Sequence, residues 1–221
     1  MATNDSHQII IFQTLRKMIG YLGIALPFLV YLGSWFDDAA PLRNSISAYY
    51  YTNSREILIA ILVSKSLLLY LYKGYSKVDN QLTNIASLLA LTIALFPTSS
   101  ETNAPTHYLF AFISPQVTDV IHLVAASTYF FTIACITYFI FTKTGNDPVT
   151  PQKAYRNRLY HTCGIIMFAS IFIMGLYKIS PSHLQFSLQQ FRPIYLFETL
   201  FLMAFGLSWI VKGGIMLKDG E

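Results

Sequence analysis

Six long apolar runs divide the chain, and each is bounded by charged residues or by turns containing Pro, Gly or Asn. A helix that crosses a bilayer needs about 20 mainly apolar residues. The runs therefore predict transmembrane helices at 18–36, 55–72, 82–97, 117–142, 159–177 and 193–211. The first run contains Pro27 and lacks a small-residue cleavage site, so we do not expect a cleaved signal peptide. The pattern predicts an all-α, polytopic membrane protein with a single six-helix domain over residues 1–221.

Basic residues in the connections predict how these helices are oriented. Lys and Arg concentrate on the cytoplasmic side of membrane proteins. Ten fall on one side of the six predicted spans: Arg16, Lys17, Lys73, Lys77, Lys143, Lys153, Arg156, Arg158, Lys212 and Lys218. Four fall on the other side: Arg43, Arg55, Lys178 and Arg192. We therefore expect both termini to be cytoplasmic.

The outer connections carry short segments that are predicted to lie at the membrane surface. Residues 37–54 combine Pro, Ser and Tyr, and tyrosine favours the headgroup level. Residues 107–113 are apolar but too short to span. Residues 183–191 repeat apolar side chains at i, i+4 and i+7, namely Leu184, Leu188 and Phe191. That spacing predicts a short amphipathic helix on the outer face.

Composition agrees with a membrane protein and excludes several other classes. Hydrophobic residues make up 54% of the chain and charged residues 12%, about half the charged share of soluble domains. A soluble domain of this size could not bury so much apolar surface. A disordered chain, a disulfide scaffold and a nucleic-acid binder with a basic surface are excluded on the same grounds. The net charge of +4 is explained by orientation signals.

Ionisable residues inside the spans are the candidates for function, because they are costly in a membrane. Lys65 lies about 15 Å into the second span at helical rise. Asp119 and His122 share one face of the fourth span at i, i+3. Glu198 lies five residues into the sixth span, at the depth of His122. Such groups also hydrogen-bond helices together without further function, and that alternative stays open.

The matched depths of His122 and Glu198 predict a polar pocket that faces the outer leaflet. A carboxylate beside an imidazole orients the ring for a base or a metal ligand. Ser47 lies in the connection above, so Ser47, His122 and Glu198 are candidate catalytic residues. The candidates for substrate binding are Arg55, which suits an anionic headgroup, together with Tyr50, Lys65 and Asp119. No GxSxG motif supports a serine hydrolase.

A metal site is a second interpretation of the same region. His107, Asp119 and His122 could supply nitrogen and oxygen ligands, and three protein ligands plus water would suit a catalytic zinc. Zinc is therefore a candidate cofactor. The chain contains no HExxH or HxxxH pair to strengthen this hypothesis.

Several motifs resemble an uncharacterised family of bacterial six-helix membrane proteins, loosely similar to the FRAG/DRAM-like group. They are NSISAYYYTNSRE (44–56), LALTIALFPTS (89–99), HLVAASTYFF starting at His122, YRNRLYHTCG (155–164) and FETLFLMAFGLSWIVKGG (197–214). The resemblance implies a bacterial inner-membrane location and no particular reaction. It places Ser45, Ser47, Tyr49, Tyr50, Arg55, His122, Glu198 and Trp209 within the motifs. Such proteins ordinarily carry a small or apolar residue at the position of Lys65.

Two functions from different classes remain open at this point. The first is a protein that binds or transports a lipid or another amphiphile, in which Lys65 pairs with Glu198 across helices. The second is a membrane-embedded lipid hydrolase or transferase that uses His122 and Glu198, with a metal ion as an optional cofactor. The expected partners are membrane lipids and, as a candidate, a second copy of the chain or another membrane protein. Nucleic acid is not an expected partner.

Overall fold

The computed structural model describes residues 2–36, 42–74, 76–100, 109–143 and 150–215. Within these ranges the chain is helical and contains no strand. The longer helices are α1 (Ala2–Gly33), α2 (Arg55–Leu71), α3 (Lys77–Leu95), α4 (Pro115–Cys135), α5 (Pro151–Ile179) and α7 (Pro193–Lys212). Shorter elements are α6 (Ser182–Leu188), the 3-10 helices η1 (Ser34–Phe36), η2 (Ser47–Tyr51) and η4 (Gln189–Phe191), and the π-helix η3 (Ile136–Ile140) that continues α4.

Four described helical segments are long and apolar enough to cross a membrane: Ile10–Phe36, Pro115–Ile140, Pro151–Ile179 and Pro193–Lys212. This confirms an all-helical chain that is consistent with a membrane protein. Helices α2 and α3 coincide with two further predicted spans, but α2 has 17 residues and the first turn of α3 carries Lys77 and Asp79. The presence of six spans therefore stays a prediction.

Helix starts are set by capping side chains, which explains why several helices begin before the apolar runs. The Ser76 hydroxyl accepts a hydrogen bond from the Asp79 amide and starts α3, five residues before the predicted span. Thr150 caps α5 in the same way, and Pro151 occupies its first position. Ser114 caps α4. Helices α3, α4 and α5 thus begin with polar residues, and a search for apolar runs does not find these first turns.

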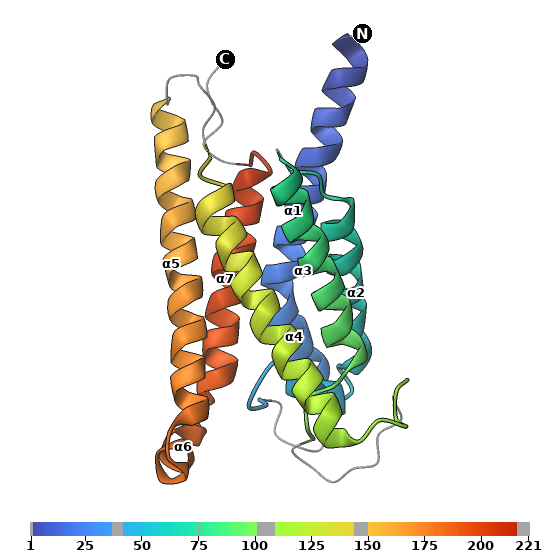
Figure 1. Ribbon diagram of the computed structural model, residues 1–221, viewed down its shortest axis with the longest axis vertical. Helices are drawn as coiled ribbons and strands as arrows, with labels where there is room; N and C mark the ends of the chain where they lie inside the picture. Colours follow the sequence, from blue (N-terminus) through green and yellow to red (C-terminus); the bar gives the residue numbers. More distant parts are fainter. Residues whose placement is uncertain (1, 37–41, 75, 101–108, 144–149, 216–221) are drawn as a thin grey trace.

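Helices α1 and α7 lie side by side, and the start of α1 and the end of α7 lie at the same end of the bundle (Figure 1). Their contact depends on glycine. A Cβ on Gly206 would lie 2.6 Å from the Gly20 carbonyl oxygen, and one on Gly20 would lie 2.7 Å from that of Gly206. Small residues of this kind let membrane helices approach closely.

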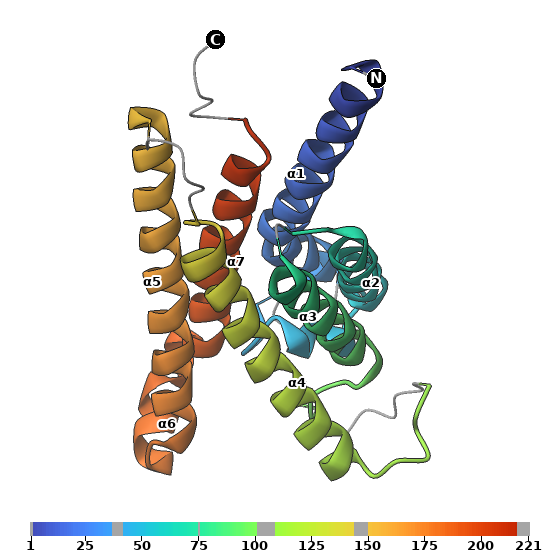
Figure 2. The same ribbon diagram turned by 45° about the horizontal axis from the view of Figure 1, so that its top comes forward.

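Helices α4 and α5 diverge along the bundle. They are close near η3, where a Cβ on Gly164 would lie 2.8 Å from the Cβ of Tyr138. Toward the opposite end, where α6 lies, the two helices separate (Figures 1 and 2). The candidate residues lie at this separated end.

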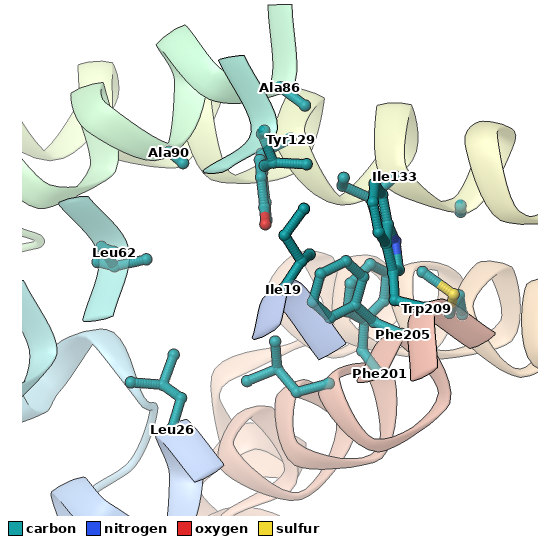
Figure 3. Packing of buried hydrophobic residues seen from close by; sticks show 14 of the residues in the cluster. Ile19, Leu26, Leu62, Ala86, Ala90, Tyr129, Ile133, Phe201, Phe205 and Trp209 are labelled. Atoms are coloured by element: carbon teal, nitrogen blue, oxygen red, sulfur yellow. The ribbon is translucent and has the colours of Figure 1, made fainter. Parts of the chain in front are cut away.

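The core between the helices is aromatic and aliphatic (Figure 3). Trp209 is fully buried, and its ring packs against Tyr72, Phe141 and Phe205 at centroid distances of 5.1–5.9 Å. The Tyr129 hydroxyl points into the interior (Figure 3) and has no hydrogen-bond partner among the described residues. The core therefore contains a polar group that packing alone does not explain.

Candidate functional site

Residues 44–54, here called the roof segment, close the separated end of the bundle and are held there by α7 and α1. The Tyr195 amide donates to the Asn44 carbonyl at 3.0 Å, and the Ile46 amide donates to the Glu198 carboxylate at 2.6 Å. The Ser54 hydroxyl donates to the Val30 carbonyl at 2.6 Å. These bonds fix the backbone on both sides of Ser47.

Ser47 and His122 form a hydrogen-bonded pair. The Ser47 hydroxyl lies 2.9 Å from Nε2 of His122, and Nδ1 of the same ring lies 2.7 Å from the Phe96 carbonyl oxygen. A carbonyl oxygen only accepts hydrogen bonds, so Nδ1 of the neutral ring carries the proton. Nε2 is then an acceptor, and the Ser47 hydroxyl donates to it. The ring is buried, at 7% exposure, so its orientation is fixed by these two bonds.

Asp119 fixes the segment that orients His122. Its carboxylate accepts hydrogen bonds from the Thr98 hydroxyl at 2.9 Å and the Ser99 amide at 2.7 Å. The Tyr51 hydroxyl donates to the Thr98 carbonyl at 2.5 Å. Asp119 and His122, on one face of α4, therefore bind successive parts of the chain that follows α3, and this arrangement sets the position of the Phe96 carbonyl.

Two cavities meet at the roof segment, one with a mainly apolar wall and one whose wall is polar and apolar in similar parts. One, of about 340 Å³, lies between α4, α5 and α7, and its apolar wall includes Leu123, Ala126, Phe130, Ile171 and Met174. Ser47, His122 and Glu198 line the same cavity. The other, of about 420 Å³, has a wall with many polar side chains, including Asn44, Ser99, Gln185, Gln189 and Arg192. The cavities share Ser45, Thr98, Lys178 and Ile194.

Glu198 lies in the predicted place but has a different partner from the predicted one. We expected its carboxylate to orient His122, but both ring nitrogens bond elsewhere and Glu198 binds the Ile46 amide. The reason is the path of the roof segment, which brings a backbone donor next to the carboxylate. Glu198 therefore acts on the pair through the backbone that precedes Ser47.

The predicted pairing of Lys65 with Glu198 is absent from the residues that the structure describes. The Lys65 ammonium instead lies over the rings of Phe205, at 4.6 Å, and Tyr129, at 5.5 Å. Lys65 and Glu198 do line a common small cavity of about 40 Å³, together with Ser47. A cavity of this size can hold a water molecule.

Arg55 and Tyr50 contact each other and line neither of the two cavities that meet at the roof segment. The guanidinium donates to the Tyr50 hydroxyl at 2.9 Å and lies 4.5 Å above the Tyr50 ring. Arg55 was expected to bind an anionic headgroup, but two other cations line the cavities instead. Lys178 lies on the wall between the cavities, and Arg192 lies on the polar one.

Lys178 and Arg192 were not predicted as site residues, because both were interpreted as orientation signals at helix ends. Arg192 carries a structural sign of its role, since its backbone is left-handed, with φ 48°. A residue other than glycine in this conformation is strained and is often held there by its surroundings. Here the Arg192 side chain donates to the Asn44 side chain and ties the start of α7 to the roof segment.

The candidate zinc site depends on a residue outside the described ranges. Asp119 and His122 are occupied by the hydrogen bonds given above, and His107 lies outside the described residues. Among the residues that the structure describes, no group of three or more His, Cys, Asp or Glu side chains could hold a metal ion. The zinc hypothesis stays a prediction.

No family model, characterised protein or solved structure matches the chain.

Proposed function

We propose that the protein binds an anionic amphiphile with a single acyl chain, placing the chain in the apolar cavity and the headgroup in the polar one. We further propose that it lies in a bacterial cytoplasmic membrane with six spans and cytoplasmic termini. The observation that carries the binding proposal is that a mainly apolar cavity and a more polar one share a wall. A ligand that is itself half apolar and half polar matches that pair of linings.

The size of the apolar cavity supports one chain rather than two. Its volume of about 340 Å³ corresponds to about eleven groups the size of a water molecule, at about 30 Å³ each. One medium-length acyl chain fills such a space, and the exposure of the wall residue Leu123 supports a position of the cavity next to the lipid region. An amphiphile can therefore enter from the membrane.

The charges support an anionic headgroup. Lys178 and Arg192 are the cations on the polar cavity wall, and no Asp or Glu side chain lines that cavity among the described residues. Amides and hydroxyls from α6 and the roof segment supply further hydrogen-bond partners. A phosphate or another headgroup anion is the ligand that such donors favour.

Native mass spectrometry of the protein in lipid nanodiscs tests the proposal, with ether-linked lysophosphatidylglycerol as the anionic probe. We expect binding that a zwitterionic ether-linked lysophosphatidylcholine does not match. Lys178→Gln is expected to weaken binding about fivefold, because an exposed charge contributes about 1 kcal/mol. Lys77→Gln, which removes an exposed lysine outside both cavities, is the charge-matched control.

Filling the apolar cavity tests where the chain lies. Gly175 lines the cavity, and a Cβ there would meet nothing within 4 Å, so the Gly175→Leu side chain starts in open space. We expect it to abolish binding of the probe, whereas Ala169→Leu, on the exposed surface of the same helix, leaves binding unchanged. Equal binding by both variants would refute this location.

A further inference from the structure

We propose that Ser47 and His122 form a nucleophile and general base that cleave a carboxylic ester in the bound amphiphile. This inference rests on the proposed binding function and adds a reaction to it. Ser47 is the acyl acceptor and Nε2 of His122 is the proton acceptor. The reaction class is ester hydrolysis, with release of a fatty acid and a polar alcohol.

The geometry of the pair is that of an activated serine. A nucleophile and its base are expected within about 2.6–3.2 Å of each other, with the base oriented by a third group. The Ser47 hydroxyl and Nε2 of His122 are 2.9 Å apart, and the Phe96 carbonyl holds the opposite ring nitrogen at 2.7 Å. This carbonyl takes the orienting role that a carboxylate has in the familiar triads. Nε2 is thereby the unprotonated nitrogen in the neutral ring.

The position of Ser47 matches the position of an ester in the proposed ligand. In an acyl amphiphile, the ester links the apolar chain to the polar headgroup. Ser47 lines the apolar cavity, its neighbour Ala48 lines the polar one, and Ser45 lies on the shared wall. A ligand that occupies both cavities therefore carries its ester past the Ser47 hydroxyl.

The proposed reaction balances with water as the co-reactant. The Ser47 oxygen attacks the ester carbonyl carbon while Nε2 of His122 takes the hydroxyl proton. The carbon–oxygen bond to the headgroup alcohol breaks, and the imidazolium returns the proton to that alcohol. Water, activated by the same nitrogen, then cleaves the acyl–Ser47 ester and restores the hydroxyl. The polar cavity beside Ser45 provides the route by which water reaches this ester.

The competing explanation is that the Ser47–His122 bond only ties the roof segment to α4, and reactivity separates the two. The wild-type protein in nanodiscs is treated with a fluorophosphonate, whose phosphorus loses fluoride to an activated serine oxygen. We expect one adduct, which peptide mass spectrometry locates on Ser47. His122→Gln should slow labelling at least about 100-fold, since general base catalysis contributes about 10²–10⁴-fold.

Matched variants and a substrate complete the test. Ser187→Ala removes an exposed serine of α6 that lines neither cavity, and it is expected to label like wild type. Ester-linked lysophosphatidylglycerol should be converted to fatty acid and glycerophosphoglycerol by wild type but not by Ser47→Ala. Ser47→Ala should still bind the ether-linked lipid, which shows that it is folded.

The outcomes separate this inference from the proposed function. Binding of the ether-linked lipid by wild type, with no adduct on Ser47 and no ester cleavage, overturns the reaction and leaves the binding proposal standing. An adduct on Ser47 that depends on His122, without lipid binding, supports the activated serine and overturns the proposed ligand. If His122→Gln does not slow labelling of Ser47, the proposed role of His122 as general base is refuted.

Discussion

Replacing Lys65 with methionine is expected to stabilise the folded protein. The Lys65 side chain is 1% exposed, and its ammonium has two aromatic rings as neighbours. Within the described ranges it has no hydrogen-bond or ion-pair partner. A buried charge of this kind opposes folding unless its neighbours compensate for the lost hydration.

The expected gain follows from three contributions. Burying an ion costs several kcal/mol after relaxation, whereas a desolvated contact with aromatic rings returns about 2 kcal/mol. Methionine is unbranched like lysine and fills the same space, so the change in packing costs less than about 1.5 kcal/mol. The net effect of Lys65→Met is an increase of about 1–3 kcal/mol in the free energy of unfolding.

Thermal unfolding in detergent, followed by fluorescence-detected size exclusion, measures this change. For a chain of this size each kcal/mol shifts the midpoint by about 2–4 °C. Lys73→Met is the matched control, because Lys73 is an exposed lysine that lies over one ring, that of Tyr70, at 5.8 Å. It should change stability by less than about 0.5 kcal/mol. A loss of more than about 1 kcal/mol in Lys65→Met would refute the reasoning, because it would show that the charge is well paired.

Three further predictions follow from contacts described above. Glu198→Ala should cost about 1–3 kcal/mol of unfolding free energy because it leaves a buried roof-segment amide unpaired, whereas Glu198→Gln keeps an acceptor and should cost less; chemical unfolding of both variants checks this. Gly206→Leu should destabilise the α1–α7 contact by at least about 1–3 kcal/mol, and Gly175→Ala should not, as thermal unfolding will show. With the native cysteines replaced, a membrane-impermeant maleimide should label Ser100→Cys but not Lys73→Cys in intact cells, and the reverse result would overturn the proposed orientation.

The positions of the long helices could be predicted from the sequence because the membrane imposes a simple rule of length and apolarity. Helix α2 begins at Arg55, the residue at which the second span was predicted to begin. Helix α7 covers residues 193–212, and the predicted span was 193–211. The same rule predicted the start of α5 at residue 159, eight residues after its actual start at Pro151. The first turns of α5 are polar, and their position depends on the Thr150 cap and not on apolarity.

The candidate site could be predicted only at the level of depth. Equal depth along two spans predicted that His122 and Glu198 lie near each other, and both line one cavity together with Ser47 from the connection above. The partners of each group could not be predicted, because they depend on the path of two irregular segments. The Phe96 carbonyl and the Ile46 amide belong to the backbone, and no pattern of side chains reveals where a backbone group points.

The glycine contact between α1 and α7 has a consequence for how the protein is made. It joins α1 to α7, which lie far apart in the sequence, so its two halves leave the ribosome at different times. Synthesis proceeds from the N-terminus, and the glycine face of α1 therefore stays uncovered until α7 has been made. Glu198 and Tyr195 also belong to α7, so the hydrogen bonds that hold the roof segment to α7 can form only at the same stage. The site is thus completed only after α7 has been made, and a chain truncated before α7 should be cleared by quality control.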